Sequence, residues 1–224
     1  MNGTKALLKR TLYTFCPRII FKLSPSRMSQ RNHWKNQNEG DRHGYQHYDQ
    51  TNEARDKVLR AEIQSLIDKD QSMLDLGCNC GRDLYEHKLI GYKKLTGIDI
   101  CRPAIEHGKK KFDLSGVELI VGSYEEALPE LIKNNRKFDM VYSGGASMAM
   151  VHPSFDIVGH ICRLSNKYVI LVNEDSPHYA YPRFWEYEFN RCGFTLAKLF
   201  RPFDGNALTK ENSYSSFAVY QKVL

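Results

Sequence analysis

The sequence predicts an α/β domain with a mostly parallel sheet covered by helices on both faces. Short apolar runs alternate with helical stretches through the middle of the chain. This alternation is typical of parallel strands joined by crossover helices. The runs are residues 72–76, 94–99, 117–121, 138–143 and 168–173, and the helices between them lie near 83–90, 103–112, 125–134 and 154–164.

The C-terminal part departs from this alternation. A helix near residues 182–191 is stopped by Gly193, and apolar runs follow at 195–201 and 216–222. The loop between these runs has no helical segment long enough for a crossover, so we expect the two strands to pair antiparallel. One more amphipathic helix is expected before the first strand, at 54–68.

The chain divides into a basic extension, a polar segment and one catalytic domain. Residues 1–35 hold eight Lys or Arg and no acid, so removing them from the net charge of +6 leaves about −2 for the rest. Residues 30–53 are polar and almost free of aliphatic side chains, which indicates a linker or loop arm rather than a core element. We therefore expect an extension at 1–35, a linker or lid arm at 36–53 and a domain at 54–224.

The extension has the pattern of an amphipathic helix. Leu8, Leu12, Phe15 and Ile19 recur at roughly helical spacing between basic residues. Three interpretations remain open: a peripheral membrane anchor, a mitochondrial presequence and a disordered basic arm. No apolar run approaches the roughly 20 residues that span a bilayer.

The six cysteines indicate neither a metal site nor a disulfide framework. They are scattered at positions 16, 78, 80, 101, 162 and 192, and the close pair Cys78 and Cys80 has no second pair to complete a tetrahedral site. No secretory signal pattern is visible. We therefore expect reduced thiols, no metal, and an intracellular location, with the cytoplasm preferred and membrane-peripheral or mitochondrial placement as alternatives.

A glycine-bearing turn follows the first predicted strand. Residues 73–81 read Met-Leu-Asp-Leu-Gly-Cys-Asn-Cys-Gly, so Gly77 lets the backbone approach a ligand and Gly81 opens the next helix, whose N-terminus offers free N–H donors. The next strand ends at Asp99, where a carboxylate can accept hydrogen bonds from both hydroxyls of a ribose. Together these features predict a nucleoside-containing cofactor.

Two residues of the turn favour a methyl donor over a dinucleotide. Asn79 stands where a dinucleotide fingerprint has its second glycine, so a pyrophosphate is less well accommodated. Asp75 lies at the strand end, where its charge would repel a pyrophosphate but suits the ammonium group of a methionine moiety. We therefore expect S-adenosylmethionine, and a nicotinamide-dependent oxidoreductase is the weaker alternative.

These residues resemble class I S-adenosylmethionine-dependent methyltransferases. Leu-Asp-Leu-Gly-Cys at 74–78 is similar to the opening motif of that family, and the likeness extends over residues 54–222. The segments 81–84, 91–99 and 138–142 resemble small-molecule and glycan methyltransferases of the broad type 11/12 group. The resemblance implies a Rossmann-like sheet of seven strands with an antiparallel last strand.

The resemblance also implies which residues hold the cofactor. The turn after the first strand would line the methionine and ribose portion, Asp99 with Ile100 would hold the ribose and adenine, and the loop at 121–125 would flank the adenine. Ser123 stands there in place of the usual Asp, so its hydroxyl, its main-chain oxygen or Glu125 would accept from the adenine amino group. The expected cofactor residues are Asp75, Gly77, Cys78, Asn79, Gly81, Asp99, Ile100, Gly122, Ser123, Tyr124, Ser143 and Gly144.

Catalytic candidates follow the fourth and fifth strands. His152 lies in the loop where such enzymes meet donor methyl and acceptor, and it could act as a general base. Glu174 and His178 follow the fifth strand, at the sheet edge where α/β folds bind ligands. Each has a plainer interpretation as a capping or solvated loop residue.

The segment before the domain offers lid candidates, of which Tyr48 is preferred. The others are Trp34, His43, Tyr45, His47 and Arg55, and ordinary loop exposure is expected for most of them.

The acceptor is expected to be a small molecule, lipid or glycan methylated on oxygen or nitrogen. An RNA or protein methyltransferase using the basic arm, or a non-catalytic cofactor-binding partner protein, are the alternatives. The absence of a Pro-Pro-aromatic motif and of a Pro-Cys nucleophile argues against two classes of nucleic-acid enzyme.

Overall fold

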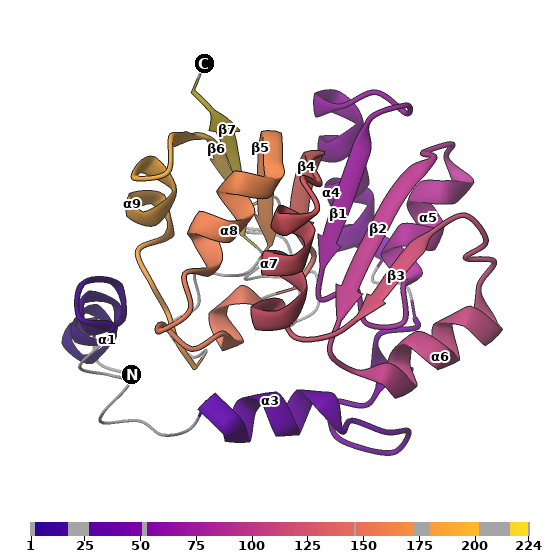
Figure 1. Cartoon of the computed structure of the whole chain (residues 1–224), viewed down its shortest axis with the longest axis horizontal. Coiled ribbons are helices and arrows are strands. Elements are labelled where there is room, and N and C mark those ends of the chain that lie inside the picture. The colour runs from indigo at the N-terminus through magenta and orange to yellow at the C-terminus, as the bar shows by residue number, and fades with distance from the viewer. Residues whose placement is uncertain are drawn as a thin grey trace.

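The computed structural model describes residues 3–17, 27–50, 53–145, 147–172, 180–201 and 216–223. Figure 1 shows a sheet with helices on its two faces and a further helix across the lower ends of the strands. The strands are β1 (Ser72–Leu76), β2 (Lys94–Asp99), β3 (Glu118–Val121), β4 (Phe138–Ser143), β5 (Ser165–Val172), β6 (Phe194–Phe200) and β7 (Phe217–Lys222). The helices that cover the sheet are α4 (Glu53–Leu66), α5 (Arg82–Leu89), α6 (Arg102–Lys111), α7 (Tyr124–Lys133), α8 (Ile157–Leu164) and α9 (Trp185–Asn190).

The seven strands are ordered β3-β2-β1-β4-β5-β7-β6. β1 to β5 pair in parallel, whereas β7 lies between β5 and β6 and is antiparallel to both. The prediction of a mostly parallel seven-stranded sheet with an antiparallel last strand is therefore confirmed. Residues 202–215 between β6 and β7 lie outside the described residues, and the antiparallel pairing is the one expected from their sequence, which has no helical segment long enough for a crossover.

Most predicted elements are present with small shifts at their ends. β1, β2 and β4 have the predicted bounds, and β5 begins three residues earlier than predicted, at Ser165. The helix expected near 154–164 begins only at Ile157, because Asp156 caps it by accepting a hydrogen bond from the Gly159 N–H at 3.0 Å. Similarly, the helix expected at 182–191 covers Trp185–Asn190.

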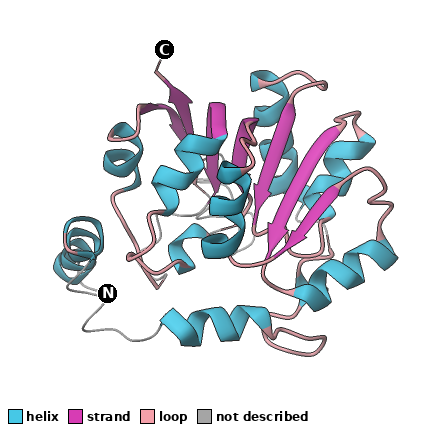
Figure 2. Cartoon of the chain, in the orientation of Figure 1, coloured by secondary structure: helices cyan, strands magenta, loops and turns pink. Residues whose placement is uncertain are grey.

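Each face of the sheet packs against its own set of helices (Figure 2). Leu74 and Leu76 face the cluster formed with α7, α8 and α9, whereas Met73 faces the cluster formed with α4, α5 and α6. This alternation within β1 follows from the two-residue repeat of a strand. The fourth member of the strand, Asp75, therefore lies on the α4 and α5 side of a buried central strand.

Two helices precede this domain. α1 (Gly3–Phe15) confirms that the basic start of the chain is helical, although Ile19 of the expected pattern lies outside the described residues. α3 (Arg27–Lys35) and a 3-10 turn, η1 (Tyr45–His47), interrupt the segment that we expected to be a linker or loop arm. The sequence did not indicate α3, because the helix is polar and its position depends on contacts with the domain. Figure 1 places α3 across the carboxyl ends of the strands.

Among the described residues, no helix is long and apolar enough to cross a bilayer.

Candidate functional site

A cavity of about 800 Å³ opens at the carboxyl ends of the central strands, and residues of α3 line it. Its walls come from the turn after β1, the end of β2, the loops after β3 and β4, the segment before α9, and the N-terminal residues from Arg31 to Arg55. Ten of the twelve residues expected to bind the cofactor line it: Asp75, Gly77, Cys78, Asn79, Asp99, Ile100, Gly122, Ser123, Tyr124 and Gly144. The predicted constellation is thus brought together in one site.

Two of the expected cofactor residues, Gly81 and Ser143, do not line the cavity. Gly81 has a φ of 74°, and a Cβ placed on it would lie 3.1 Å from the Leu114 side chain, so it is required for the backbone turn. Ser143 is fully buried, with its Oγ 3.0 Å from the Oγ of Ser147. Both residues therefore support the structure around the cavity without lining it.

The turn after β1 is held in shape by hydrogen bonds and by left-handed backbone conformations. Gly77 and Asn79 have φ values of 75° and 49°. The Gly77 N–H donates to the Ile98 carbonyl at 2.9 Å, and the Asn79 side-chain oxygen accepts from the Cys80 N–H at 2.9 Å. Asparagine is one of the few residues besides glycine that tolerates this conformation, because its side chain bonds locally. The turn therefore keeps its backbone open toward the cavity.

Asp99 anchors the turn to the end of β2. One carboxylate oxygen accepts from the Asn79 N–H at 2.8 Å, and the other accepts from the Cys101 N–H at 2.7 Å. Burial raises the pKa of the Asp99 carboxyl, although these backbone donors favour the ionised form. A carboxylate has about four lone-pair positions, so Asp99 can accept from the backbone of the loop and still accept from a ligand in the cavity.

The carboxyl group of Asp75 is buried, and burial makes its ionised form unfavourable. Only 2% of its surface is exposed, and burial raises the pKa of its carboxyl well above the usual range. The nearby charge of Asp83 raises the pKa of Asp75 further. A cation placed in the cavity beside Asp75 would therefore relieve an unfavourable interaction.

A network of charged residues beside Asp75 was not anticipated from the sequence. Arg82 pairs with both Asp56 of α4 and Asp83, and Arg55 bonds Asp56 at 2.8 Å. Burial alone would raise the pKa of the Asp56 carboxyl, but the hydrogen bond from Arg82 and the charges of both arginines bring it below its usual value. Only Arg55 was singled out beforehand. The others carry no local signal, because α4 and α5 meet only in the folded chain.

Ser123, in the loop after β3, takes part in a capping box at the start of α7. Its hydroxyl and its carbonyl therefore already have hydrogen-bond partners. The Ser123 hydroxyl donates to Glu126 at 2.8 Å and accepts from Arg31 of α3 at 3.1 Å. The Ser123 carbonyl accepts from the N–H groups of Glu126 and Ala127. Arg31 also reaches Glu126 at 3.1 Å, so this loop holds α3 over the cavity.

The N-terminal segment forms part of the cavity wall. Trp34, His43, Tyr48 and Arg55 all line it, together with His33 and Gln37. The expectation of ordinary loop exposure is therefore wrong for Trp34 on α3, for His43 in the loop after it and for Arg55 on α4. Tyr48 contacts the cavity as expected, while Tyr45 instead stacks on His107, with ring centroids 4.5 Å apart. His47 does not line the cavity.

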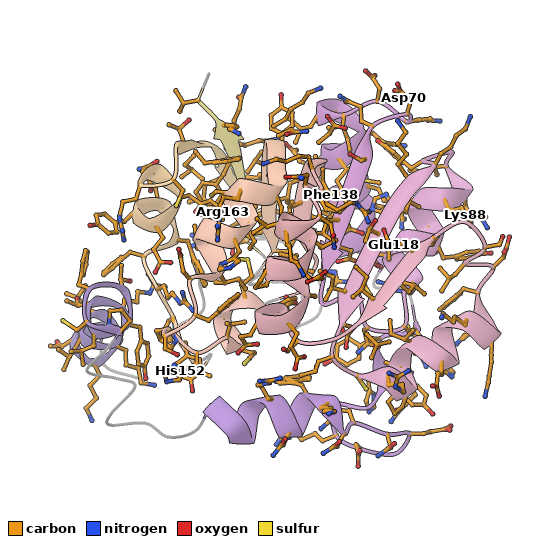
Figure 3. All side chains as sticks on the ribbon, viewed as in Figure 1. Asp70, Lys88, Glu118, Phe138, His152 and Arg163 are labelled. Atoms are coloured by element: carbon orange, nitrogen blue, oxygen red, sulfur yellow. The ribbon has the colours of Figure 1, made fainter. Side chains whose placement is uncertain are left out.

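His152 lies in the wall on the other side of the cavity, with Met150, Val151 and Tyr181. Figure 3 shows it at the same lower edge of the molecule as α3. It is 2% exposed, and its ring contacts that of Tyr181 with centroids 5.1 Å apart. Its Nδ1 accepts a hydrogen bond from the Ser154 N–H at 3.1 Å. The other catalytic candidates, Glu174 and His178, lie outside the described residues.

No group of three or more His, Cys, Asp or Glu side chains in the described part of the chain is arranged to hold a metal ion.

The fold and the site together define an α/β protein with a cofactor cavity at the carboxyl ends of its strands. A family model described as a methyltransferase domain matches residues 67–215, and the chain belongs to this family. It is thus an S-adenosylmethionine-dependent methyltransferase with a class I fold. No curated protein matches the sequence significantly.

Solved structures share this fold at low sequence identity. A TehB-like SAM-dependent methyltransferase from Corynebacterium glutamicum has a TM-score of 0.58 at 18% identity, covering 77% of this chain and 89% of that one. The CcbJ methyltransferase from Streptomyces caelestis has a TM-score of 0.58 at 13% identity, covering 78% and 91%. A magnesium protoporphyrin IX methyltransferase from Synechocystis, solved with bound SAM, has a TM-score of 0.55 at 12% identity and covers 97% of each chain.

Proposed function

We propose that this methyltransferase acts on a small-molecule, lipid or glycan acceptor, at oxygen or nitrogen, inside the cavity that residues of α3 help to line. The observation that carries the proposal is that the turn after β1 and the wall containing His152 enclose one cavity of about 800 Å³. Ligand pockets of roughly 300–1,000 Å³ are typical of small-molecule sites. Donor and acceptor would have to share this volume, which favours a compact acceptor group over a protein surface or an RNA duplex.

The methionine end of the donor would lie beside Asp75. Its ammonium group would offset the charge of this buried carboxylate, and Arg55, which lines the same region, would suit the donor carboxylate. Gly77 lines the same region. A Cβ on it would lie 2.7 Å from the Ser147 Cβ, so a side chain here would displace the loop after β4 that forms part of the cavity wall.

The adenosine end would lie between Asp99, Ile100 and the loop after β3. Asp99 would accept from the ribose hydroxyls with its remaining lone pairs. Both oxygens of Ser123 already take part in the capping box, which favours Glu125, another cavity residue, as the acceptor for the adenine amino group. Tyr48 and Trp34 would cover this end from the N-terminal segment.

Methyl transfer from a sulfonium is an in-line displacement, so alignment supplies most of the acceleration. A bond forms between the acceptor oxygen or nitrogen and the methyl carbon while the bond from carbon to sulfur breaks. The products are the methylated acceptor and S-adenosylhomocysteine. The proton that the acceptor loses goes to water or to a protein base.

The hydrogen bonds of His152 favour a donor role over the general-base role considered from the sequence. A backbone N–H always donates, so Nδ1 is unprotonated and the neutral ring carries its proton on Nε2. The Ser154 hydroxyl, 2.9 Å from Nδ1, is compatible with the same tautomer. A protonated Nε2 would donate a hydrogen bond to an acceptor oxygen and orient it, but it would take no proton from it.

The acceptor class is tested by incubating the purified full chain with methyl-labelled S-adenosylmethionine and fractions of a cell extract. We expect label in the small-molecule, lipid or glycan fraction and in neither RNA nor protein. Label in RNA or protein would overturn the acceptor assignment. Tight binding of S-adenosylhomocysteine with no label in any fraction would instead indicate a non-catalytic cofactor-binding protein.

The role of His152 is tested by comparing His152→Gln with His152→Phe. Glutamine keeps an N–H donor and phenylalanine does not, so we expect kcat/KM to fall about tenfold or more in His152→Phe and less in His152→Gln. Binding of S-adenosylhomocysteine, measured by calorimetry, should be unchanged in both. A pH profile in which an ionisation near neutrality disappears in His152→Gln would show that His152 is a base after all.

A further inference from the structure

Helix α1 is amphipathic and packs on the domain, yet several of its apolar side chains are exposed. With 3.6 residues per turn, Arg10, Tyr13 and Thr14 share one side of the helix, and Leu8, Leu12 and Phe15 share the opposite side. Thr14 is 8% exposed and accepts a hydrogen bond from the Phe184 N–H at 3.0 Å. Tyr13 contacts the ring of Tyr181, with centroids 5.5 Å apart. The helix therefore contacts the domain through Tyr13 and Thr14 and, at its C-terminal end, through Phe15, whose ring centroid lies 6.2 Å from that of Phe184.

Exposed apolar side chains of α1 and α9 form what we call the outer stripe: Leu7, Leu8, Phe15 and Tyr187. Leu7, Leu8 and Phe15 are 57%, 59% and 52% exposed. Phe15 packs on Tyr187 of α9, with ring centroids 4.8 Å apart, so the stripe continues from α1 onto the domain. Single exposed leucines are ordinary on protein surfaces, but several exposed apolar side chains gathered on one helix mark an interaction site.

The charges around the outer stripe indicate what covers it. α1 contains Lys5 and Lys9 and no acid, and Arg191 lies over the Tyr187 ring. The exposed acid closest in sequence to the stripe is Glu186, which these three basic side chains outnumber. Leucine and aromatic side chains flanked by lysine are the features of a helix that lies in an anionic membrane surface. Two copies of this chain would instead bring lysine against lysine.

We propose that the outer stripe is a docking surface for a membrane containing anionic phospholipid. The leucines and Phe15 would enter the boundary of the acyl chains, and Lys5 and Lys9 would contact lipid phosphates. Tyr13 of the same helix contacts Tyr181, which lines the cavity next to His152. Docking would therefore hold this wall of the cavity close to the membrane surface.

Membrane binding is measured with the full chain and no methyl donor, by co-sedimentation with two kinds of vesicle. One contains phosphatidylcholine alone, and the other contains phosphatidylcholine mixed with phosphatidylserine. We expect binding to the phosphatidylserine vesicles that weakens as salt is added, and at least about tenfold weaker binding to phosphatidylcholine alone. Equal binding to both vesicles, or binding to neither, would overturn the proposal.

Two variants and a matched control locate the surface. Leu7→Ser with Leu8→Ser, and separately Lys5→Glu with Lys9→Glu, should each weaken binding to phosphatidylserine vesicles at least about tenfold. Leu89→Ser removes a leucine that is 63% exposed on α5, and should bind like the unmodified chain. Binding of S-adenosylhomocysteine checks that each variant is folded. Full membrane binding by both folded variants would refute the docking surface, as would a concentration-dependent dimer that the leucine variant loses.

Discussion

Asp99→Ala is expected to weaken the binding of S-adenosylhomocysteine by at least about 100-fold. Two hydrogen bonds from ribose hydroxyls to a carboxylate would be lost, at about 1.5–3 kcal/mol each. The substitution also removes the acceptor for the N–H groups of Asn79 and Cys101, so the turn that lines the donor site would lose its anchor. Isothermal titration calorimetry measures the effect directly.

The same substitution could act by destabilising the protein, so a milder variant accompanies it. Asp99→Asn keeps one carbonyl oxygen and nearly the same shape, and we expect an intermediate loss of affinity. Asp113→Asn is the matched control, because Asp113 is an exposed acid that pairs with Lys88 on the surface. It should bind S-adenosylhomocysteine normally. Normal binding by a folded Asp99→Ala variant would refute the ribose assignment.

Asp75→Asn is expected to stabilise the protein and to weaken donor binding at the same time. The folded-state pKa of Asp75 lies above its unfolded value, chiefly because of burial. Its contribution to stability is therefore fully present below the unfolded pKa and is lost as pH rises through the folded pKa. Asparagine does not ionise, so the advantage of the variant should grow with pH above about 4. We expect it to gain about 1–2 kcal/mol in free energy of unfolding near neutral pH.

Donor binding should change in the opposite direction. The ionised Asp75 would attract the ammonium group of the methionine moiety, so Asp75→Asn should bind S-adenosylhomocysteine about tenfold more weakly or worse. Urea denaturation over a series of pH values gives the stability, and calorimetry gives the affinity. Asp70→Asn serves as the control, since Asp70 is exposed at the far end of the molecule from His152 (Figure 3). Unchanged stability in Asp75→Asn would contradict the raised pKa, and unchanged affinity would show that Asp75 takes no part in donor binding.

The two proposals are connected through the N-terminal helices. α3 is held over the donor site by Arg31, and α1 contacts the wall that contains Tyr181 and His152. A segment that the sequence marked as separate from the domain thus contacts both ends of the cavity. A lipid-borne acceptor would be consistent with the labelling result expected above and with membrane docking. The proposal on the acceptor and the proposal on membrane docking can nevertheless fail independently.

The sequence by itself determined the strands, their direction and the turn that begins the donor site. These features are local: apolar runs show the period of strands and helices, and the residues from Asp75 to Gly81 directly follow one of them. Asp99 could be assigned because the end of the next parallel strand lies at the same sheet edge. For these features, position along the chain decides position in space.

Only the tertiary structure decided the placement of α3, the pairing of Asp56 with Arg82, and the orientation of α1. α3 is polar and has no apolar face to predict where it binds, and Asp56 and Arg82 are 26 residues apart on different helices. The period of α1 predicted an amphipathic helix, but not that Leu7, Leu8 and Phe15 stay exposed where the helix packs on the domain. The proton position on His152 likewise depends on a hydrogen bond formed in the folded loop. Such contacts join segments whose residue types carry no local preference for one another, so the folded chain has to bring them together.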